Sequence, residues 1–397
     1  MKALHNFLEE KIKPNFDKGA KFEKLWPVYD GFATFLFVPG HTAESGAHIR
    51  DGIDLKRTMN TVITALIPCL LFGMWNVGYQ HYNALGLDVT FFDQILFGAI
   101  KVIPMVIVSY GVGLGMEFLF CVLKGHQIEE GYLVTGMLIP LIMPVDLPLW
   151  MLALSSAFAV VIGKEVFGGT GMNIFNPALL ARAFAFFAYP TWMSGDKVWI
   201  NTSLADGQSV VDGFSGATIL GDLATTGTTS YSPLEAFIGI IPGSVGETST
   251  LLILLGAGLL IFTGIGSWKI MLSGIVGGAV MGIIFNIVAP FAISPEQQAF
   301  MAVPFWQQLI YGGFAFGIVF MATDPVSGSQ TESGKWVYGF LIGFLGVMIR
   351  VFNPAYPEGI MLAILFMNTM APLIDHYVIQ ANIKKRQKRL ALKTAGA

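Results

Sequence analysis

The sequence predicts an all-α polytopic membrane protein with about ten transmembrane helices, arranged as two inverted five-helix repeats with both termini in the cytoplasm. Hydrophobic residues make up 54% of the 397-residue chain, charged residues only 12%, and the mean hydropathy is +0.64. Segments such as 61–75 and 251–266 are apolar on every face, as expected of helices surrounded by lipid. The alternating ten-residue segments of a membrane β-barrel are not visible in the sequence.

Glycine, proline and charged residues divide the apolar sequence into its elements. The segment 1–56 is charged and has no apolar stretch typical of a secretion signal, so we expect a cytoplasmic N-terminal segment. The first repeat, 57–190, has predicted spans near 59–79, 96–123, 131–145, 149–166 and 175–190. A polar periplasmic loop, 191–247, follows. The second repeat, 248–378, has predicted spans near 249–266, 269–291, 305–322, 335–352 and 357–378, and a basic cytoplasmic tail occupies 379–397.

The short third span carries Pro140 and Pro144, so we expect it to be broken or not to cross the membrane fully. Orientation follows from the basic residues, which are enriched in cytoplasmic segments. With a cytoplasmic N-terminus, 19 of the 23 Lys and Arg residues lie inside, and Lys197 alone lies in an outer loop. The loop 191–247 then follows five spans and faces the periplasm.

Two pairs of similar segments indicate an internal repeat. The sequence from 174 to 187 resembles that from 351 to 366, since each begins a span with Asn-Pro-Ala. Upstream, 131–137 resembles 313–319, and each leads to a proline turn. Five spans per repeat place the second repeat upside down in the membrane, and inverted repeats with broken helices commonly surround a binding site.

Several polar side chains lie at or within the spans, where each is costly unless it has a partner. Glu117 is either functional or a carboxylate that reaches out to the inner interface. Asp324 precedes Pro325, so it either binds a cation or polar ligand or caps a turn. Asp375, near the inner end of the last span, fits a solvated interface position. The stripe of Phe314, Phe316 and Phe320 indicates packing, or an apolar constriction that opens and closes.

Two glycine-containing segments end in helix starts. The inner segment 166–178 lacks the Gly-Lys-Ser/Thr of a phosphate loop, but Asn173 and Asn176 offer amide donors and acceptors there. The outer segment 241–249 fits either an anion-binding site, with backbone amides and Ser244, or a turn capped by Thr248 or Ser249. Cys69 and Cys121 have no metal-ligand spacing, and the net charge of −3 does not favour nucleic-acid binding.

The order of these motifs identifies a resemblance. "DLKRTMN", "KEVFGGTGMNIFNPALLARAF", "SGAT", "IPGSVGE", "FMATDPVS", "SGKWVYG" and "NPAYPEGIMLAILF" together resemble the B subunit of the Na⁺-translocating NADH:quinone reductases over nearly the whole chain. The resemblance to the D subunit of the Rnf ferredoxin:NAD oxidoreductases is more distant, and the extension "KPNFDKGAKFEKLWPVYD" favours the first family.

The resemblance implies one subunit of a six-subunit complex of the bacterial inner membrane. Electrons from NADH, which binds a partner subunit, pass through flavins and iron–sulfur centres to ubiquinone or menaquinone, and Na⁺ moves outward. A flavin transferase attaches FMN as a phosphoester to the threonine of the SGAT motif, here Thr218. Asp212, Ser215, Gly216 and Ala217 complete the acceptor pattern.

The resemblance also implies a non-covalent riboflavin, with Asn173, Asn176 and Asp324 at its site. Quinone-site residues match Gly113, Leu114, Glu117 and Asp30, where Leu114 replaces the second of two glycines and Asp30 replaces a glutamate. An ion path near Asp324, Phe316, Phe320 and Asp375 is our hypothesis from the broken helix and the repeat.

Two other functions fit part of the sequence. An ion-coupled secondary transporter fits the inverted repeat and the intramembrane carboxylates, but does not explain an SGAT motif on the outer face. A scaffold subunit without cofactors fits the low charge and the absence of cysteine ligands. Bound flavin distinguishes these functions from that of a redox subunit.

Overall fold

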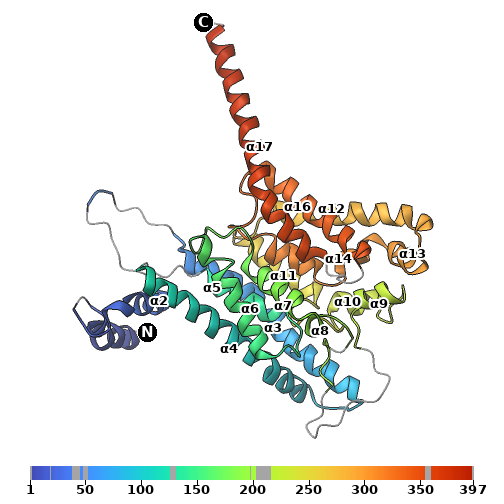
Figure 1. The fold of residues 1–397 in the computed structure, drawn as a ribbon, viewed down its shortest axis with the longest axis horizontal. Coiled ribbons are helices and arrows are strands. Elements are labelled where there is room, and N and C mark those ends of the chain that lie inside the picture. Colours follow the sequence, from blue (N-terminus) through green and yellow to red (C-terminus); the bar gives the residue numbers. More distant parts are fainter. Residues whose placement is uncertain are drawn as a thin grey trace.

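A computed structural model describes residues 2–17, 19–37, 45–47, 52–125, 131–196, 198–202, 216–353 and 359–395. Within these ranges every regular element is helical, and the helices pack into one bundle from which the C-terminal helix projects (Figure 1). The all-α polytopic class predicted from composition is therefore confirmed.

The first half of the bundle contains five apolar helices in the predicted order. They are α3 (Leu55–Leu85), α4 (Phe91–Lys124), α5 (Tyr132–Leu141), α6 (Leu149–Val161) and α7 (Pro177–Ala188), with a 3₁₀ turn at Glu165–Phe167. The second half contains α11 (Thr250–Phe262), α12 (Trp268–Val288), α14 (Phe305–Ile310), α15 (Phe314–Phe316), the π-helix η6 (Gly317–Met321), α16 (Glu332–Phe352) and α17 (Gly359–Ala395).

Six helical segments in the described part of the chain are long and apolar enough to cross a membrane: Leu55–Leu85, Phe91–Lys124, Leu149–Phe167, Trp268–Phe291, Glu332–Phe352 and Gly359–Leu392. The predicted third, fifth and sixth spans are the shorter apolar helices Tyr132–Leu141, Pro177–Ala188 and Thr250–Phe262. The predicted span near 305–322 is divided among α14, α15 and η6. Short and broken helices thus occur in both halves of the chain.

Capping side chains and glycines set the helix ends. Asp54 accepts a hydrogen bond from the backbone N–H of Arg57 at 2.9 Å and caps α3. Thr90 and Asp93 form a capping box at the start of α4. Gly125 ends α4 with a φ of 73°, a left-handed conformation that glycine adopts without strain.

Close helix packing depends on small residues. A Cβ added to Gly98 of α4 would collide with the backbone of Met74 in α3. A Cβ added to Gly343 of α16 would collide with the backbone of Gly274 in α12. Glycine therefore allows these helix pairs to approach until their backbones touch, as is common in membrane helix bundles.

The segment predicted as a polar periplasmic loop is folded where the structure describes it. It contains α8 (Pro190–Met193), α9 (Ile219–Thr225) and α10 (Pro233–Ile238), and residues 203–215 lie outside the described ranges. Leu220 and Leu223 of α9 and Ala236 of α10 are buried in the hydrophobic core. This segment therefore packs on the end of the bundle, where α9 contacts α13 (Pro295–Ala302).

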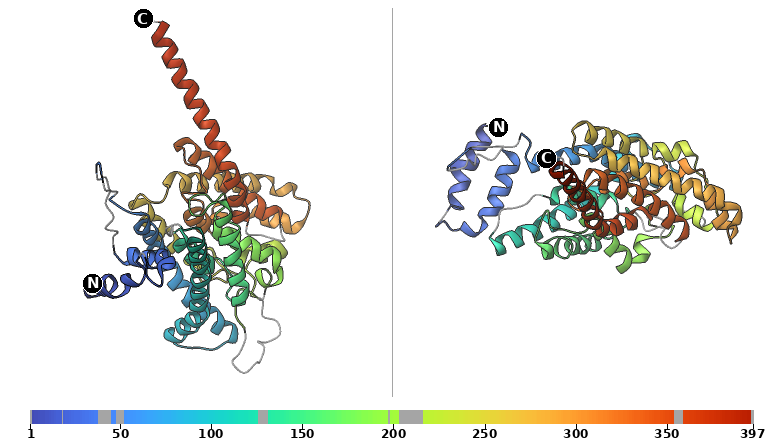
Figure 2. Two further views of the ribbon diagram at one scale, coloured as in Figure 1. Left: turned by 60° about the vertical axis from the view of Figure 1, so that its left-hand side comes forward. Right: turned by 90° about the horizontal axis from the view of Figure 1, so that it is seen from above.

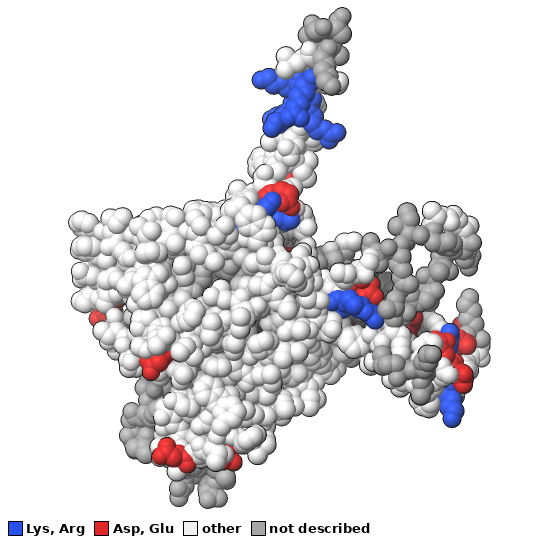
Figure 3. Space-filling model, turned by 180° about the vertical axis from the view of Figure 1, so that it is seen from behind, with Lys and Arg blue, Asp and Glu red and all other residues white. Residues whose placement is uncertain are grey.

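The two terminal segments carry most of the exposed positive charge. The predicted tail 379–397 does not form a separate segment up to residue 395, because α17 continues through it and projects from the bundle (Figure 2). Basic side chains gather on this projecting helix and around the N-terminal segment, whereas the bundle surface between them is largely uncharged (Figure 3). An uncharged belt of this kind suits contact with lipid.

The N-terminal segment lies beside the bundle. It contains α1 (Lys2–Phe7), a π-helix at Leu8–Ile12, 3₁₀ turns at Lys13–Asn15 and Glu23–Leu25, and α2 (Trp26–Leu36). Phe32 of α2 contacts Phe118 of α4, with ring centroids 5.6 Å apart. Arg57 at the start of α3 donates a hydrogen bond to the carbonyl of Thr34 at 3.2 Å. These contacts hold α2 against the same end of α3 and α4.

Candidate functional site

One pocket lies between the two halves of the bundle, at the end that the sequence predicts to be cytoplasmic, and we call it the inner pocket. Its empty space, including the open mouth, is about 820 Å³. The first half contributes the start of α3, the start of α5 and the segment that leads into α7, whereas the second half contributes the end of α11, η6 and the turn after it. Its polar lining residues are Thr58, Thr135, Lys164, Thr170, Asn173, Asn176, Thr323 and Asp324. The structure therefore brings together the three predicted residues Asn173, Asn176 and Asp324.

Hydrogen bonds hold two of these predicted residues in place. Asn176 caps α7, since its side-chain oxygen accepts from the backbone N–H groups of Ala178 at 3.0 Å and Leu179 at 3.4 Å. The Asp324 carboxylate accepts from the hydroxyl of Ser327 at 2.5 Å and from the backbone N–H of Val326 at 3.3 Å. Asp324 thus caps a turn and also lines the pocket, and its binding of a cation or polar ligand stays a prediction.

Asn368 of α17 joins the two sides of this pocket. Its side-chain oxygen accepts from the backbone N–H of Asn176 at 3.2 Å. Its amide group donates to the carbonyl of Ser327 at 3.2 Å and to the hydroxyl of Tyr338 at 2.9 Å. Asn368 is only 1% exposed. One buried amide therefore positions the start of α7 relative to the Asp324 turn.

Lys164 connects the inner pocket to the buried carboxylate of α4. Lys164 lines the pocket, and its ammonium group forms an ion pair with Glu117. The two side chains are only 4% and 2% exposed. Glu117 therefore does not reach out to the interface, and that interpretation of this residue was wrong. A second pair, Lys124 with Glu165 at 3.0 Å, lies nearby on the same two elements.

A second pocket, at the end of the bundle that the sequence predicts to be periplasmic, contains Thr218, the predicted flavin anchor; we call it the outer pocket. Its lining residues are Thr218, Ile219, Leu220, Ile241, Pro242, Gly243, Ser244, Glu247, Thr248, Gly312 and Gly313. Thr218 is half-buried and caps α9, because its hydroxyl oxygen accepts from the backbone N–H of Gly221 at 3.2 Å. Ala217 is also half-buried and Gly216 is buried. Asp212 and Ser215 lie outside the described residues.

The predicted anion-binding segment 241–249 forms one wall of the outer pocket. Ser249 caps α11 by accepting from the backbone N–H of Leu252 at 3.4 Å, which supports the turn-and-cap interpretation for the end of the segment. Thr248 lines the pocket, and its buried hydroxyl makes no hydrogen bond with any described residue. A buried hydroxyl of this kind is costly unless a ligand or water satisfies it.

Burial and the nearby Asp196 carboxylate raise the pKa of Asp222 in α9.

Two buried guanidinium groups lie behind the outer pocket. Arg182 of α7 donates to the hydroxyl of Ser244 at 3.0 Å and lies 3.5 Å from the carboxylate of Glu247. Arg350 of α16 donates to the carbonyl of Gln308 at 2.7 Å. A Cβ added to Gly312 would lie 3.9 Å from Nη2 of Arg350. Each arginine therefore lies next to a residue that lines the outer pocket: Arg182 next to Ser244, and Arg350 next to Gly312.

The same two elements reach both pockets. Helix α11 begins beside Thr248 of the outer pocket and ends at Leu260 of the inner pocket. The broken helix α15–η6 begins after Gly313 of the outer pocket and contributes Phe320 to the inner pocket. At about 1.5 Å per residue, the pockets are on the order of 15–20 Å apart along these helices.

The phenylalanine stripe lies between the pockets. Phe314, Phe316 and Phe320 are at most 4% exposed, and the rings of Phe316 and Phe320 are 5.0 Å apart. The packing predicted for these residues is therefore present. Whether Phe316 and Phe320 border an ion path stays a prediction.

The predicted quinone-site residues lie around the inner half of α4. Leu114 and Asp30 are half-buried, the latter on α2. Gly113 is buried, and a Cβ added to it would collide with the ring of Tyr132. The planar ring next to Gly113 is therefore that of Tyr132, which gives this glycine a packing role. A Cβ on Gly111 or Gly115 would meet nothing within 4 Å.

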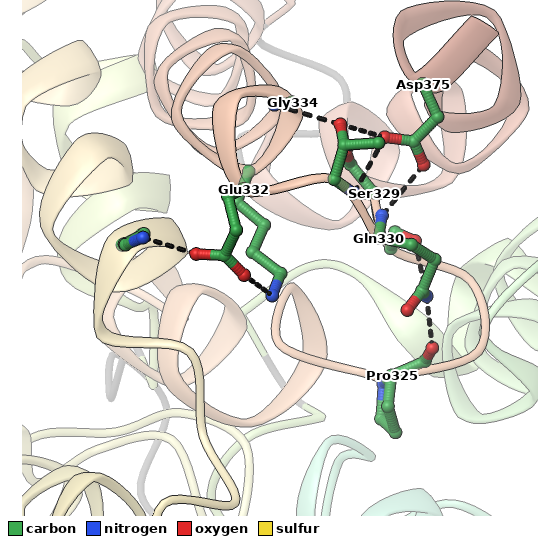
Figure 4. Close-up of polar contacts among 10 residues, drawn as sticks. Pro325, Ser329, Gln330, Glu332, Gly334 and Asp375 are labelled. Carbon is green, nitrogen blue, oxygen red and sulfur yellow. Dashed lines mark hydrogen bonds and ion pairs between the residues drawn. The ribbon is translucent and has the colours of Figure 1, made fainter. Parts of the chain in front are cut away.

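Asp375 holds the start of α16 rather than facing a pocket. Its carboxylate accepts from the hydroxyl of Ser329 at 2.7 Å and from the backbone N–H groups of Gln330 at 2.8 Å and Thr331 at 3.0 Å (Figure 4). Thr331 also donates its hydroxyl at 2.5 Å. Gln330 in turn donates to the carbonyl of Pro325, which follows Asp324. The structure therefore links Asp375 to the Asp324 turn through hydrogen bonds.

Three residues without a predicted role, Asn368, Lys164 and Arg182, contact the pockets or their walls. Asn368 and Arg182 each lie within an apolar helix, and an intramembrane polar residue is by itself a signal of a functional or structural site. No local sequence pattern indicates the role of Lys164, because its partner Glu117 lies 47 residues away in the sequence.

Comparisons with known proteins identify the family of this chain. The model of the family described as "NQR2, RnfD, RnfE family" matches residues 42–384. A protein of Chromohalobacter salexigens, named as the B subunit of Na(+)-translocating NADH-quinone reductase, is 46% identical, over 98% of this chain and 97% of its own length. Proteins of the same name from Stutzerimonas stutzeri and Azotobacter vinelandii are each 45% identical, over 98% of this chain and 99% of theirs.

Proposed function

The chain belongs to the NQR2, RnfD, RnfE family, and we propose that it is the flavin-carrying membrane subunit of a Na⁺-translocating NADH:quinone oxidoreductase. It is a multi-pass protein of a bacterial inner membrane. The identity of 44–46% to relatives named as the B subunit of that enzyme, over nearly the whole chain, favours this function over an Rnf-type subunit. NADH is oxidised on a partner subunit of a six-subunit complex.

The observation that carries this proposal is a pair of pockets, one at each end of α11, that contain the residues expected for two flavins. Thr218 lines the outer pocket, and Asn173, Asn176 and Asp324 line the inner one. A bound flavin supplies redox chemistry that the side chains of this chain do not offer.

The outer pocket fits the phosphate of FMN attached to Thr218. Gly243, Ser244 and Thr248 line it, and hydroxyl and backbone N–H groups of such residues bind phosphate oxygens. A Cβ on Gly313 would lie 2.8 Å from Glu247, so the pocket keeps its space only because glycine occupies that wall. Thr218 is half-buried in a helix cap, so we infer that a flavin transferase acts before this segment packs.

The inner pocket fits the ring of riboflavin. Apolar walls from Val62, Val134 and Leu138 alternate with the amide of Asn173 and the carboxylate of Asp324. Mostly apolar pockets with a few polar groups are typical of sites for planar cofactors. Lys164 adds a positive charge to this wall.

Quinone reaches the cytoplasmic side, between α2 and the inner half of α4. The contact between Phe32 and Phe118 supports this placement because it brings the aromatic segment of α2 to α4. Glu117 lies on that part of α4, and its partner Lys164 lines the inner pocket. The Na⁺ path lies near Asp324, where a broken helix ends inside the repeat.

The decisive experiment replaces Thr218 with alanine in the complete complex, produced together with its transferase. We expect the flavin fluorescence of this subunit in a denaturing gel to disappear, while riboflavin remains extractable. Thr225→Ala is the matched control, because Thr225 is an exposed threonine of the same helix. It should keep full fluorescence.

Unchanged fluorescence in the Thr218→Ala variant would exclude Thr218 as the anchor. Thr218→Ser should retain part of the label, because a hydroxyl remains. A colourless wild-type protein that moves a solute without its partners would instead indicate the secondary transporter.

A further inference from the structure

Three buried charges lie together behind the outer pocket. Glu247 is 5% exposed, Arg182 is 2% exposed and Arg350 is fully buried. Glu247 lines the outer pocket, and Arg182 donates a hydrogen bond to Ser244, another residue that lines this pocket. Among the described residues, this cluster contains two guanidinium groups and one carboxylate.

Contacts with several helices and loops hold the three side chains in place. Arg182 comes from α7, Arg350 from α16, and Glu247 from the segment before α11. Arg350 also lies over the ring of Phe314, 5.8 Å from its centroid. A backbone hydrogen bond from Gly246 to the carbonyl of Leu141, at 2.7 Å, ties the Glu247 segment to the end of α5. The charges therefore keep their positions relative to the pocket.

Charges in such a place act strongly on a bound cofactor. Water screens a buried charge poorly, so its field extends further than that of an exposed charge. Maintaining two guanidinium groups in an apolar core is costly, which is why intramembrane arginines are commonly functional.

We propose that Arg182 and Arg350 raise, and Glu247 lowers, the reduction potential of a flavin attached to Thr218; this inference rests on the proposed function. Reduction adds electrons to the flavin ring and increases its negative charge. A nearby guanidinium stabilises the reduced form relative to the oxidised form, whereas a carboxylate has the opposite effect. The three residues act only through the electric field of their charges and take up no proton or electron themselves.

The test is a redox titration of the purified complex with dithionite. Each flavin accepts two electrons, the dithionite is oxidised to sulfite, and protons come from the solvent. Each variant is also made with Thr218→Ala, and the difference between the two titrations isolates the attached flavin. Fluorescence in a denaturing gel measures how much flavin is attached, independently of turnover.

The expected shifts have opposite signs. In Arg182→Gln and Arg350→Gln, the ratio of reduced to oxidised flavin at a fixed potential should fall about tenfold, which corresponds to about 30 mV for a two-electron couple. In Glu247→Gln the same ratio should rise about tenfold. Arg350→Lys keeps the charge and should stay close to wild type. Lys269→Gln, at the far end of α12, is the matched control and should cause no shift.

If the three residues had a purely structural role, all variants would shift the reduction potential in the same direction, or would change only the amount of attached flavin. Attached flavin with unshifted potentials in Glu247→Gln and the arginine variants overturns the inference and leaves the proposed function intact. Absence of attached flavin in the wild type overturns the proposed function instead. If the arginine variants fail to assemble, the isosteric Glu247→Gln decides alone, because a carboxamide fills the same volume without the charge.

Discussion

Replacing Lys164 with methionine tests how strongly its ion pair with Glu117 holds α4 against the end of α6. The two side chains are 4% and 2% exposed, so the change leaves a buried carboxylate without its cation. Breaking a buried pair in this way costs about 3–5 kcal/mol. The pair between Lys269 and Glu332 is the natural comparison, since its side chains are 27% and 67% exposed. Losing such an exposed pair costs about 0–1 kcal/mol.

The assay is thermal unfolding in detergent, followed by a thiol-reactive dye. Cys69 is 2% exposed on α3, so it reacts only when the helices separate. Cys121 is replaced with serine in every variant to leave one reporter thiol. We expect Lys164→Met to lower the apparent midpoint by on the order of 4–6 °C, because the unfolding entropy of a chain of this length is large. Lys269→Met should lower it by no more than about 2 °C.

The double variant Glu117→Gln/Lys164→Met separates charge from packing. It removes both charges of this buried pair, so it should recover more than half of the stability lost in Lys164→Met. Equal midpoints for Lys164→Met and Lys269→Met would refute the assignment of a stabilising buried pair. A double variant that is less stable than Lys164→Met would show that packing, not charge, dominates.

Further variants test the other sites. Asp324→Asn should weaken the dependence of turnover on Na⁺ or reduce the riboflavin content, and unchanged values of turnover, Na⁺ activation and riboflavin would contradict its role. Gly113→Val should displace the ring of Tyr132, destabilise the fold by about 1–3 kcal/mol and reduce quinone and artificial-acceptor activities equally. Gly115→Val adds its side chain in open space, so it should raise the Michaelis constant for quinone alone; an unchanged constant would argue against quinone on that face. Asp375→Ala should lower stability by about 2 kcal/mol in the same thiol assay, because it removes the acceptor that holds the start of α16, and a wild-type midpoint would contradict this.

The candidate site was partly predictable because some of its signals are local. Asn176 precedes Pro177, and the sequence placed this pair at a helix start, where the structure has Asn176 as the cap of α7. Asp324 before Pro325 marked a helix end in the same way. The resemblance then grouped Asn173, Asn176 and Asp324, and the structure places all three at one pocket.

Other parts of the site depend on contacts between distant residues. Nothing near Gly113 in the sequence indicates that the ring of Tyr132 fills the space beside it. Asn368 reaches Asn176 across 192 residues, and Arg182 reaches Ser244 across 62. An apolar helix offers many faces, and composition alone does not determine which face meets which neighbour.

By itself, the sequence determined the helical class, the order of apolar segments and their breaks, because each depends on residues within one or two turns of helix. Only the tertiary structure decided that Glu117 is buried against Lys164, that Asp375 holds the start of α16, and that Arg182 lies behind the pocket of Thr218. In an apolar bundle a polar side chain takes whichever partner the packing brings within about 3 Å. That partner is set by how the helices cross, which no local pattern specifies.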